Sequence, residues 1–284
     1  MSDASHRGVQ ARVTDGLSRF PWWALVILLM GVVLAFNFKT NDTYAAIIGN
    51  LSHGIRYTIQ VTLIAYSVAV ILGLVTAMGQ LSSQIAFRNL AMLYVQIVRG
   101  VPIIVQIFYS AFVLVPAVVA LVNSVGGWLA SVGVFQNDNA FARLTSRDID
   151  FIWRGIVALA ISYGAFSSEI FRAGIQSIER GQVDAAKALG LTWLQSFRLV
   201  IFPQAFRRIL PPLGNDFIAM LKESSLVSAI GVQEITQLGK KYAAASFLFP
   251  QTYNTVAFLY LSMTLLLSMG VKFMERRLRT GSSS

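Results

Sequence analysis

Six long apolar runs, separated by polar segments, constrain this chain more than any other feature of its sequence. A helix needs about 20 largely apolar residues to cross the roughly 30 Å hydrocarbon core of a bilayer. Only 13% of the residues are charged, against about 25% in a typical soluble domain. The chain is therefore predicted to be an all-α integral membrane protein with about six transmembrane helices. The runs are Trp22–Phe38, Tyr57–Met78, Val101–Val122, Ile152–Phe171, Ile209–Ile230 and Thr255–Val271.

The basic residues orient these spans. Residues 1–20 are polar and basic and are predicted to form a cytosolic tail, followed by an N-terminal span over residues 21–38. No small-residue cleavage site follows this span, so we expect it to remain uncleaved. With six spans and the tail inside, most of the 23 lysine and arginine residues fall in cytosolic segments, as the positive-inside tendency requires. Both termini are therefore expected in the cytosol, and the net charge of +10 needs no nucleic-acid partner.

The fifth run is the least apolar of the six. Its polar residues must be shielded by protein or line a water-filled path, because lipid cannot solvate them. Its prolines are expected to break the helix. The unusual residues of the fifth run are Pro211, Pro212, Asn215, Asp216, Lys222 and Glu223.

The connection between the third and fourth runs is long. Residues 116–150 are rich in glycine and asparagine and are predicted to form an extended external excursion.

A polar loop over residues 176–206 connects the fourth and fifth spans. Val183–Leu189 is predicted to form a short helix with Asp184 in its first turn, ended by Gly190. Thr192 and Gln195 have the spacing of a capping box for a second helix, and Pro203 interrupts the chain before the fifth span. Spacing alone allows two interpretations. The helices either staple two spans together at the interface, or act as a lever that passes force between a partner and the membrane helices.

Several motifs in this order resemble those of one transporter family. The stretch Gln182–Gly190 with Val200–Pro203 resembles the EAA loop of ATP-binding-cassette (ABC) importer permeases, so residues 176–206 are hereafter the coupling loop. Residues 47–280 resemble the polar amino-acid branch of these type I importer permeases. The further motifs are Tyr94–Gln106, Glu169–Ile175, Pro203–Ala205 with Pro211–Asn215, and Lys222–Leu226. The departures are Asp184 in place of glutamate, Phe202 in place of leucine and Ser224 in place of threonine.

The resemblance implies a five-span permease domain over residues 47–280, with the N-terminal span as an addition. It implies a multi-pass protein of the bacterial inner membrane that works as half of an ATP-driven importer for polar, including basic, amino acids. A second permease chain, identical or homologous, would complete the pathway. A cytosolic ATPase dimer would dock on the coupling loop, and a periplasmic or lipid-anchored binding protein would deliver the amino acid. The implied docking residues are Asp184, Ala185, Ala186, Leu189 and Gly190.

The chain itself contains no glycine-rich phosphate loop ending in Gly-Lys-Ser/Thr. ATP and magnesium are therefore expected in the partner ATPase, and no cofactor, metal ligand or catalytic residue is expected in this chain. With no cysteine, thiol catalysis and cysteine-ligated metals are excluded. An intramembrane enzyme is not supported either, because the sequence has no Ser/His pair or HExxH motif.

Charged and polar residues within the spans are candidates for the substrate pathway, because their insertion into lipid is costly. Glu169 has two interpretations that the sequence leaves open. It forms a salt bridge with Arg172 or Arg99 near the cytosolic interface, or it accepts a cationic group of the substrate. The same polar residues could also serve an ion-coupled secondary transporter or channel that needs no ATPase. The full set of candidates is Glu169, Ser168, Asn215, Asp216, Lys222 and Ser225.

Overall fold

The computed structural model describes residues 22–133 and 140–280, and the predicted tail over residues 1–20 lies outside them. These residues form helices and turns, and none of them forms a β-strand. The α-helices are α2 (Trp22–Thr40), α3 (Asp42–Gln80), α4 (Ile85–Gly100), α5 (Ile103–Tyr109), α6 (Val115–Ser131), α7 (Ala140–Arg143), α8 (Phe151–Gln176), α9 (Arg180–Ala188), α10 (Trp193–Ser196), α11 (Phe202–Glu223), α12 (Ile235–Ser246) and α13 (Phe249–Thr280). Shorter helical turns are η1 (Ser110–Leu114), η2 (Ser146–Asp148), η3 (Phe197–Ile201) and η4 (Ser224–Ile230).

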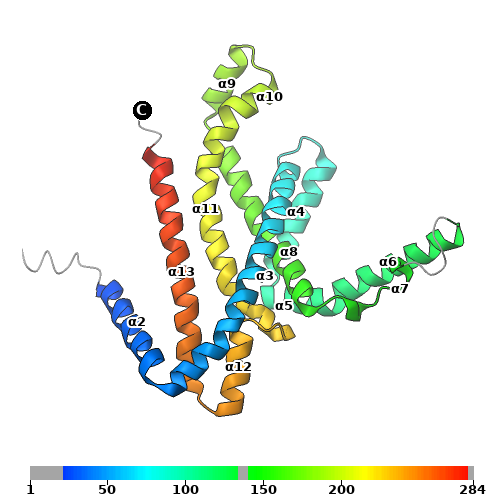
Figure 1. The fold of residues 1–284 in the computed structure, drawn as a ribbon. Coiled ribbons are helices and arrows are strands. Elements are labelled where there is room, and N and C mark those ends of the chain that lie inside the picture. Colours follow the sequence, from blue (N-terminus) through cyan, green and yellow to red (C-terminus); the bar gives the residue numbers. More distant parts are fainter. Residues whose placement is uncertain (1–21, 134–139, 281–284) are drawn as a thin grey trace, which may run out of the picture.

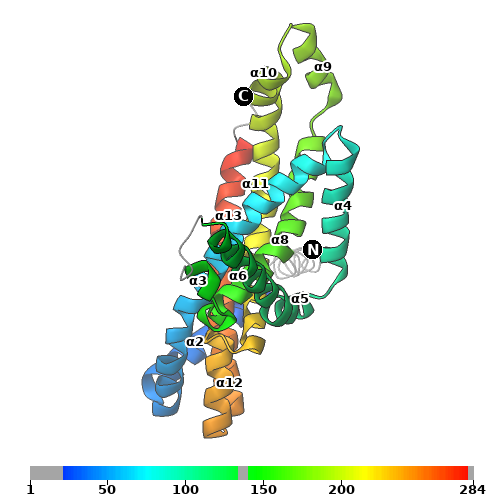
Figure 2. The same ribbon diagram turned by 90° about the vertical axis from the view of Figure 1, so that its right-hand side faces the viewer.

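The long helices α3, α8, α11 and α13 run between two ends of an elongated molecule (Figure 1). One end carries α9 and α10, the turn between α3 and α4, and the C-terminal end of α13. The other end carries α12 and the junction between α2 and α3, and the quarter-turn view agrees (Figure 2). The coupling loop and the C-terminal end of α13 therefore lie on one side of the bundle.

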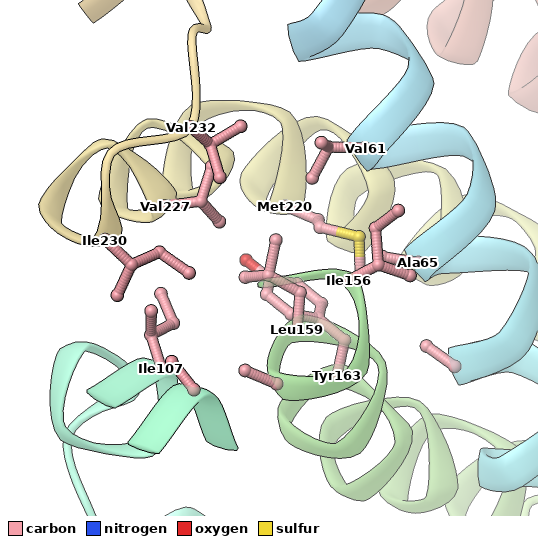
Figure 3. Close-up of a cluster of buried hydrophobic side chains, with 13 residues drawn as sticks. Val61, Ala65, Ile107, Ile156, Leu159, Tyr163, Met220, Val227, Ile230 and Val232 are labelled. Carbon is pink, nitrogen blue, oxygen red and sulfur yellow. The ribbon is translucent and has the colours of Figure 1, made fainter. Parts of the chain in front are cut away.

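Small residues allow the central helices to pack closely. A Cβ atom at Gly73 of α3 would lie 2.8 Å from the Cβ of Ser167 on α8, and one at Gly174 would lie 2.1 Å from Cγ1 of Ile209 on α11. Membrane helices associate by such close packing because lipid supplies no hydrophobic force between them. Beyond these contacts, Figure 3 shows apolar side chains of α3, α5, α8, α11 and η4 meeting in one core, including Val61, Ile107, Leu159, Met220 and Val227.

Four helical stretches are long and apolar enough to cross a membrane, namely Asp42–Gln80, Ile103–Ser131, Phe151–Gln176 and Phe249–Leu278. Leu25–Thr40 is a shorter apolar helix. The second predicted run is therefore part of a 39-residue helix, α3, which begins at Asp42 rather than at Tyr57. The structure also contains α4, a helix of 16 residues that the apolar runs did not indicate. Its arginines Arg88 and Arg99 lower its hydropathy, yet it packs against α3 and α8 within the bundle.

The third predicted run does not follow one straight span. The chain is extended at Val101, with φ −107° and ψ 133°, and Pro102 precedes the first turn of α5. Beyond η1, α6 projects sideways from the bundle (Figures 1 and 2). Arg154 of α8 holds the base of this excursion, because its guanidinium donates to the carbonyl oxygens of Ala111, Ser146 and Ile149. The described parts of the excursion, residues 116–133 and 140–150, are thus largely helical and are fastened to the N-terminal end of α8.

The expected break at the prolines of the fifth run is wrong. Helix α11 continues through Pro211 and Pro212 to Glu223, and the 3₁₀ turn η4 follows it. Each proline lacks the N–H group that would bond to the carbonyl one turn earlier, at Arg207 and Arg208. The polar residues of this run therefore project from one continuous helix, in which residues seven apart share a face.

Candidate functional site: a coupling loop joined to polar helices

The coupling loop folds locally as its sequence indicates, with one shift in register. Helix α9 begins at Arg180, so Asp184 lies in its second turn and not in the first turn as predicted. Gly190 has φ +78°, the left-handed conformation that glycine adopts without strain. The N–H of Leu191 donates to the carbonyl of Ala186 over 3.1 Å, which completes a glycine-ended helix terminus.

The predicted capping box is present at the start of α10. The side chain of Gln195 accepts from the N–H of Thr192 over 2.9 Å, and the hydroxyl of Thr192 accepts from the N–H of Gln195. Pro203 stands in the first turn of α11, where its missing N–H is tolerated. The π-helical turn η3 links α10 to α11 directly, so the second helix of the loop runs into the fifth predicted span.

The five residues implied as docking residues divide into one anchor and an exposed surface. Ala186 is 3% exposed and faces the rest of the loop. The side chain of Asp184 is 71% exposed and Leu189 is 82% exposed, while Ala185 and Gly190 are exposed as well. The neighbouring Trp193 is also 73% exposed. A large apolar surface of this kind beside a charge is typical of a site that binds another protein.

The coupling loop is firmly attached to α8 and α11. Gln204 of α11 donates to Gln182 of α9 over 2.6 Å, and Arg208 donates to the carbonyl of Ser177 over 2.5 Å. An apolar cluster around Phe171, Ile178 and Ile209 fills the space between the elements. A displacement of α9 would therefore be passed to both helices, because packed interiors deform little. A row of aromatic rings continues this contact along α10, η3 and α11, namely Trp193, Phe197, Phe202 and Phe206.

Glu169 on α8 is surrounded by cationic and amide donors. Arg172 donates to both carboxylate oxygens, over 2.5 Å to Oε2 and 3.3 Å to Oε1. Gln80 of α3 donates to Oε1 over 3.2 Å, and Nη1 of Arg99 on α4 lies 3.9 Å from Oε2. The carboxylate thus connects three helices, which is the first of the two interpretations of Glu169. A small cavity of about 370 Å³ opens beside Arg99 and Phe166.

Asp216 on α11 has a different environment. The hydroxyl of Ser167 on α8 donates to its Oδ2 over 3.0 Å. In residues 22–133 and 140–280, no lysine or arginine forms an ion pair with Asp216. One turn earlier, Tyr66 of α3 donates to the carbonyl of Leu213 over 2.6 Å. Asp216 is therefore a half-buried carboxylate within the bundle that has a hydroxyl partner and no cation.

The other candidates are not brought together with Asp216. Asn215 and Lys222 are exposed on one face of α11, seven residues apart, and Ser225 is half-buried on η4. Ser168 is fully buried beside Gly73, and its hydroxyl donates to the carbonyl of Ala165. The six candidates therefore occupy separate places rather than one pocket.

Sequence reasoning missed two polar groups near the core. Ser168 is the α8 serine among the predicted candidates, although it is its neighbour Ser167 that bonds to Asp216. Glu223 was noted as polar but not selected, and its Oε2 is buried without a hydrogen bond in the described residues. Asp216 and Glu223 are seven residues apart, so helical periodicity could have placed them on one face. The described residues contain no group of three or more His, Asp or Glu side chains that could hold a metal ion.

The membrane-length apolar helices, and the exposed loop bonded to two helices of the bundle, are features of a membrane transport subunit. Residues 69–280 match the family of binding-protein-dependent transport system inner membrane components, and the chain belongs to this family. Membership does not favour a secondary transporter or channel that works without an ATPase.

Relatives of known function lie within the same family. A glutamine transport system permease protein of Escherichia coli is 31% identical over 81% of this chain and 93% of its own length. An arginine transport system permease protein of Corynebacterium glutamicum is 29% identical over 99% of this chain and 87% of its own length. A crystal structure of an amino acid ABC transporter with histidines has a TM-score of 0.66 and 32% identity, over 83% of this chain and 97% of that one.

Proposed function

We propose that this chain forms half of the translocation pathway of an ATP-driven importer of polar amino acids. The observation that carries the proposal is the coupling loop, which is exposed to a partner and yet bonded to α8 and α11. These two helices bear Glu169 and Asp216. The transport of glutamine and of arginine by the relatives named above supports polar amino acids as the substrate class.

The partners follow from this arrangement. A cytosolic ATPase dimer docks on Asp184, Ala185, Leu189 and Gly190, with Ala186 supporting that surface from behind. ATP and magnesium bind to the ATPase, and this chain holds no cofactor. A second permease chain covers the exposed face of α11, and a periplasmic or lipid-anchored binding protein delivers the amino acid on the opposite side. With the coupling loop in the cytosol of a bacterium, the C-terminal end of α13 lies on the cytosolic side as well (Figure 1).

Transport proceeds by alternating access. Closure of the ATPase dimer draws the α9 helices of the two permease chains together. Each α9 displaces α11 through the Gln204–Gln182 hydrogen bond and displaces α8 through the cluster around Ile178. The substrate pathway then opens to the outside, and ATP hydrolysis reverses the movement. Asp216 accepts the ammonium group that every amino acid carries, because a half-buried carboxylate without a cation favours a cationic ligand.

Reconstitution with the ATPase and the binding protein tests this function. Asp184→Lys reverses the charge at the centre of the docking surface. A loss of about 1.4 kcal/mol in the free energy of docking weakens the affinity for the ATPase about tenfold. ATP-dependent uptake is therefore expected to fall by about tenfold or more. Asp42→Lys is the matched control, because Asp42 is an exposed residue at the opposite end of the bundle. Normal ATP-driven uptake by Asp184→Lys, or uptake by the wild type with an ion gradient and no ATP, would contradict the proposal.

A further inference from the structure

An apolar crevice of about 1150 Å³ separates α2 from α13. The two helices meet where the rings of Phe38 and Phe258 lie 5.3 Å apart, close to the junction between α2 and α3. Figure 1 shows that they diverge from there toward the end that carries the C-terminus. The crevice is therefore a wedge, closed at the α12 end of the bundle and open toward the side of the coupling loop. Its walls include Met30, Val33, Leu261 and Leu265.

A single lysine, Lys272 of α13, is the charged residue that lines this crevice. Lys272 is exposed, and its ammonium group forms no hydrogen bond or ion pair within the described residues. Glu275, Arg276 and Arg277 follow within about one turn outside the lining, and the last turns of α13 are cationic on balance. The remaining lining is apolar apart from a few uncharged side chains such as Asn37 and Ser268.

We propose that this crevice binds an anionic phospholipid from the leaflet on the coupling-loop side. The acyl chains lie between α2 and α13, and the phosphate lies beside Lys272. Pockets of about 300–1,000 Å³ suffice for drug-sized ligands, so the crevice has room for long acyl chains. Flexible chains can fill a wedge down to its narrow end, whereas a helix with a diameter of about 10–12 Å cannot. Lysine near a membrane surface attracts anionic lipids.

The lipid would support the N-terminal helix. The side chains of α2 leave most of their apolar surface exposed, including Leu28, Val32 and Phe36. At Gly31 an added Cβ would lie 3.9 Å from Phe258, an ordinary van der Waals contact, so α2 meets α13 there without needing the glycine. A bound lipid fills the gap and links α2 to the bundle. This inference depends on membrane insertion and on the orientation of the bundle, and not on which substrate is transported.

The test uses the full-length permease, purified with its ATPase, and native mass spectrometry of the lipids it retains. Equal amounts of phosphatidylglycerol and phosphatidylcholine with identical acyl chains are supplied. The wild type is expected to retain phosphatidylglycerol about fivefold better, the preference that one lysine near anionic lipid produces. Lys272→Gln should reduce this ratio to near one. The matched control Lys241→Gln, an exposed lysine on α12, should preserve it.

A second pair of variants tests the site of the acyl chains. Ala257→Trp fills the crevice and should lower the retention of both lipids, while Ala244→Trp, on an exposed face of α12, should not. Equal retention of the two lipids by the wild type would overturn the proposal, as would unchanged preference in Lys272→Gln or unchanged retention in Ala257→Trp. These outcomes do not depend on transport, so they are distinguishable from a failure of the proposed function.

Cross-linking tests whether a second copy of the chain occupies the crevice instead. The sequence contains no cysteine, so Leu265→Cys introduces one thiol that lines the crevice. With lipid in the crevice, this thiol should not form a disulfide between two copies in membranes. Efficient disulfide formation between copies would place a helix of a neighbouring chain there and would overturn the lipid assignment.

Discussion

Glu169 and Asp216 are both carboxylates on helices that the coupling loop joins, yet their surroundings are opposite. Glu169 lies beside two arginines and receives a hydrogen bond from Gln80. Asp216 receives a hydrogen bond from Ser167, and no cation in the described residues pairs with it. A charge within the membrane is costly unless something neutralises it. The comparison indicates that the chain itself neutralises Glu169, and we propose that the charge of Asp216 is available to a ligand.

On the basis of this difference we propose a structural role for Glu169 and a substrate role for Asp216. Glu169 connects α8 to α3 and α4 near the coupling loop, so its ion pairs fix the positions of three helices. Asp216 lies deeper in the bundle, where it accepts a hydrogen bond from Ser167 of α8. One turn earlier on α11, the carbonyl of Leu213 accepts a hydrogen bond from Tyr66 of α3. Predictions for the two carboxylates therefore differ in size and in the quantity that should change.

The largest effect is expected at Asp216. Asp216→Asn keeps the shape of the side chain and its bond to Ser167 but removes the charge that would bind an ammonium group. A hydrogen bond to a charged group contributes about 1.5–3 kcal/mol, so the KM for uptake should rise by about 10–100-fold. The measurement is the concentration dependence of uptake in vesicles, with thermal unfolding as a check on folding.

The two neighbouring serines provide matched controls for Asp216. Ser167→Ala removes the hydroxyl that bonds to Asp216 and should raise the KM by about fivefold, the value of one ordinary hydrogen bond of about 1 kcal/mol. Ser168→Ala removes a hydroxyl that bonds only to the backbone of its own helix, and the KM should stay unchanged. An unchanged KM in Asp216→Asn, or equal effects of the two serine variants, would contradict a substrate role for Asp216.

A smaller effect, of another kind, is expected at Glu169. Glu169→Gln leaves Arg172 and Arg99 without their counterion. Both arginines are partly exposed to solvent, so the loss of stability should be about 1 kcal/mol, which lowers the melting temperature by about 2–4 °C. The KM should change little. Thermal unfolding and uptake, measured on the same preparation, separate these outcomes, and a large rise of the KM without loss of stability would return Glu169 to a substrate role.

A double mutant sharpens this prediction. In Glu169→Gln combined with Arg172→Gln, an unpaired cation is removed together with its counterion, so part of the stability should return. Interacting pairs show non-additivity of this kind. If the effects of the two substitutions simply add, the ion pair does not account for the stability change.

How far the sequence could predict this fold follows from what hydropathy measures. Runs of apolar residues located α2, α8 and α13 because lipid or core surrounds these helices along most of their length. They missed the first part of α3, where Asn50, Ser52 and Arg56 are polar and yet helical, and they missed α4 because of its arginines. Hydropathy indicates whether lipid or water surrounds the side chains of a segment. Within the membrane a helix forms because the backbone N–H and C=O groups need hydrogen-bond partners, whatever the side chains are.

The candidate site shows a similar limit. The glycine end of α9 and the capping box of α10 depend on residues close in sequence, so their patterns predicted them. The contact between Ser167 and Asp216 joins residues 49 positions apart. It depends on how α8 and α11 pack, and the close approach of Gly174 to Ile209 helps to set that packing. No local pattern could distinguish Ser167 from Ser168.

Glu234 extends the comparison to a carboxylate outside the spans, with the smallest expected effect. It is fully buried at the start of α12 and accepts hydrogen bonds from the N–H groups of Thr236 and Gln237 and from the hydroxyl of Tyr260. Burial raises the pKa of Glu234 above its ordinary value, although these hydrogen bonds oppose the shift. The folded state therefore binds the proton more tightly than the unfolded state. Its contribution to stability is complete at a pH below the unfolded pKa and is lost as the pH rises through the folded pKa.

The matching variant is Glu234→Gln, which cannot titrate and retains an acceptor oxygen for one of the two N–H groups. We expect the melting temperature of the wild type to fall as the pH rises above about 4.3, the ordinary pKa of glutamate, with a shallower fall in the variant. The measurement is thermal unfolding in detergent at a series of pH values, with Glu179→Gln as a control at an exposed position. If the melting temperatures of the wild type and Glu234→Gln change with pH in parallel, burial of a carboxylate without a cation is not sufficient to make stability depend on its protonation. The same argument from burial would then fail for Asp216, and only a direct measurement of substrate affinity could support its role.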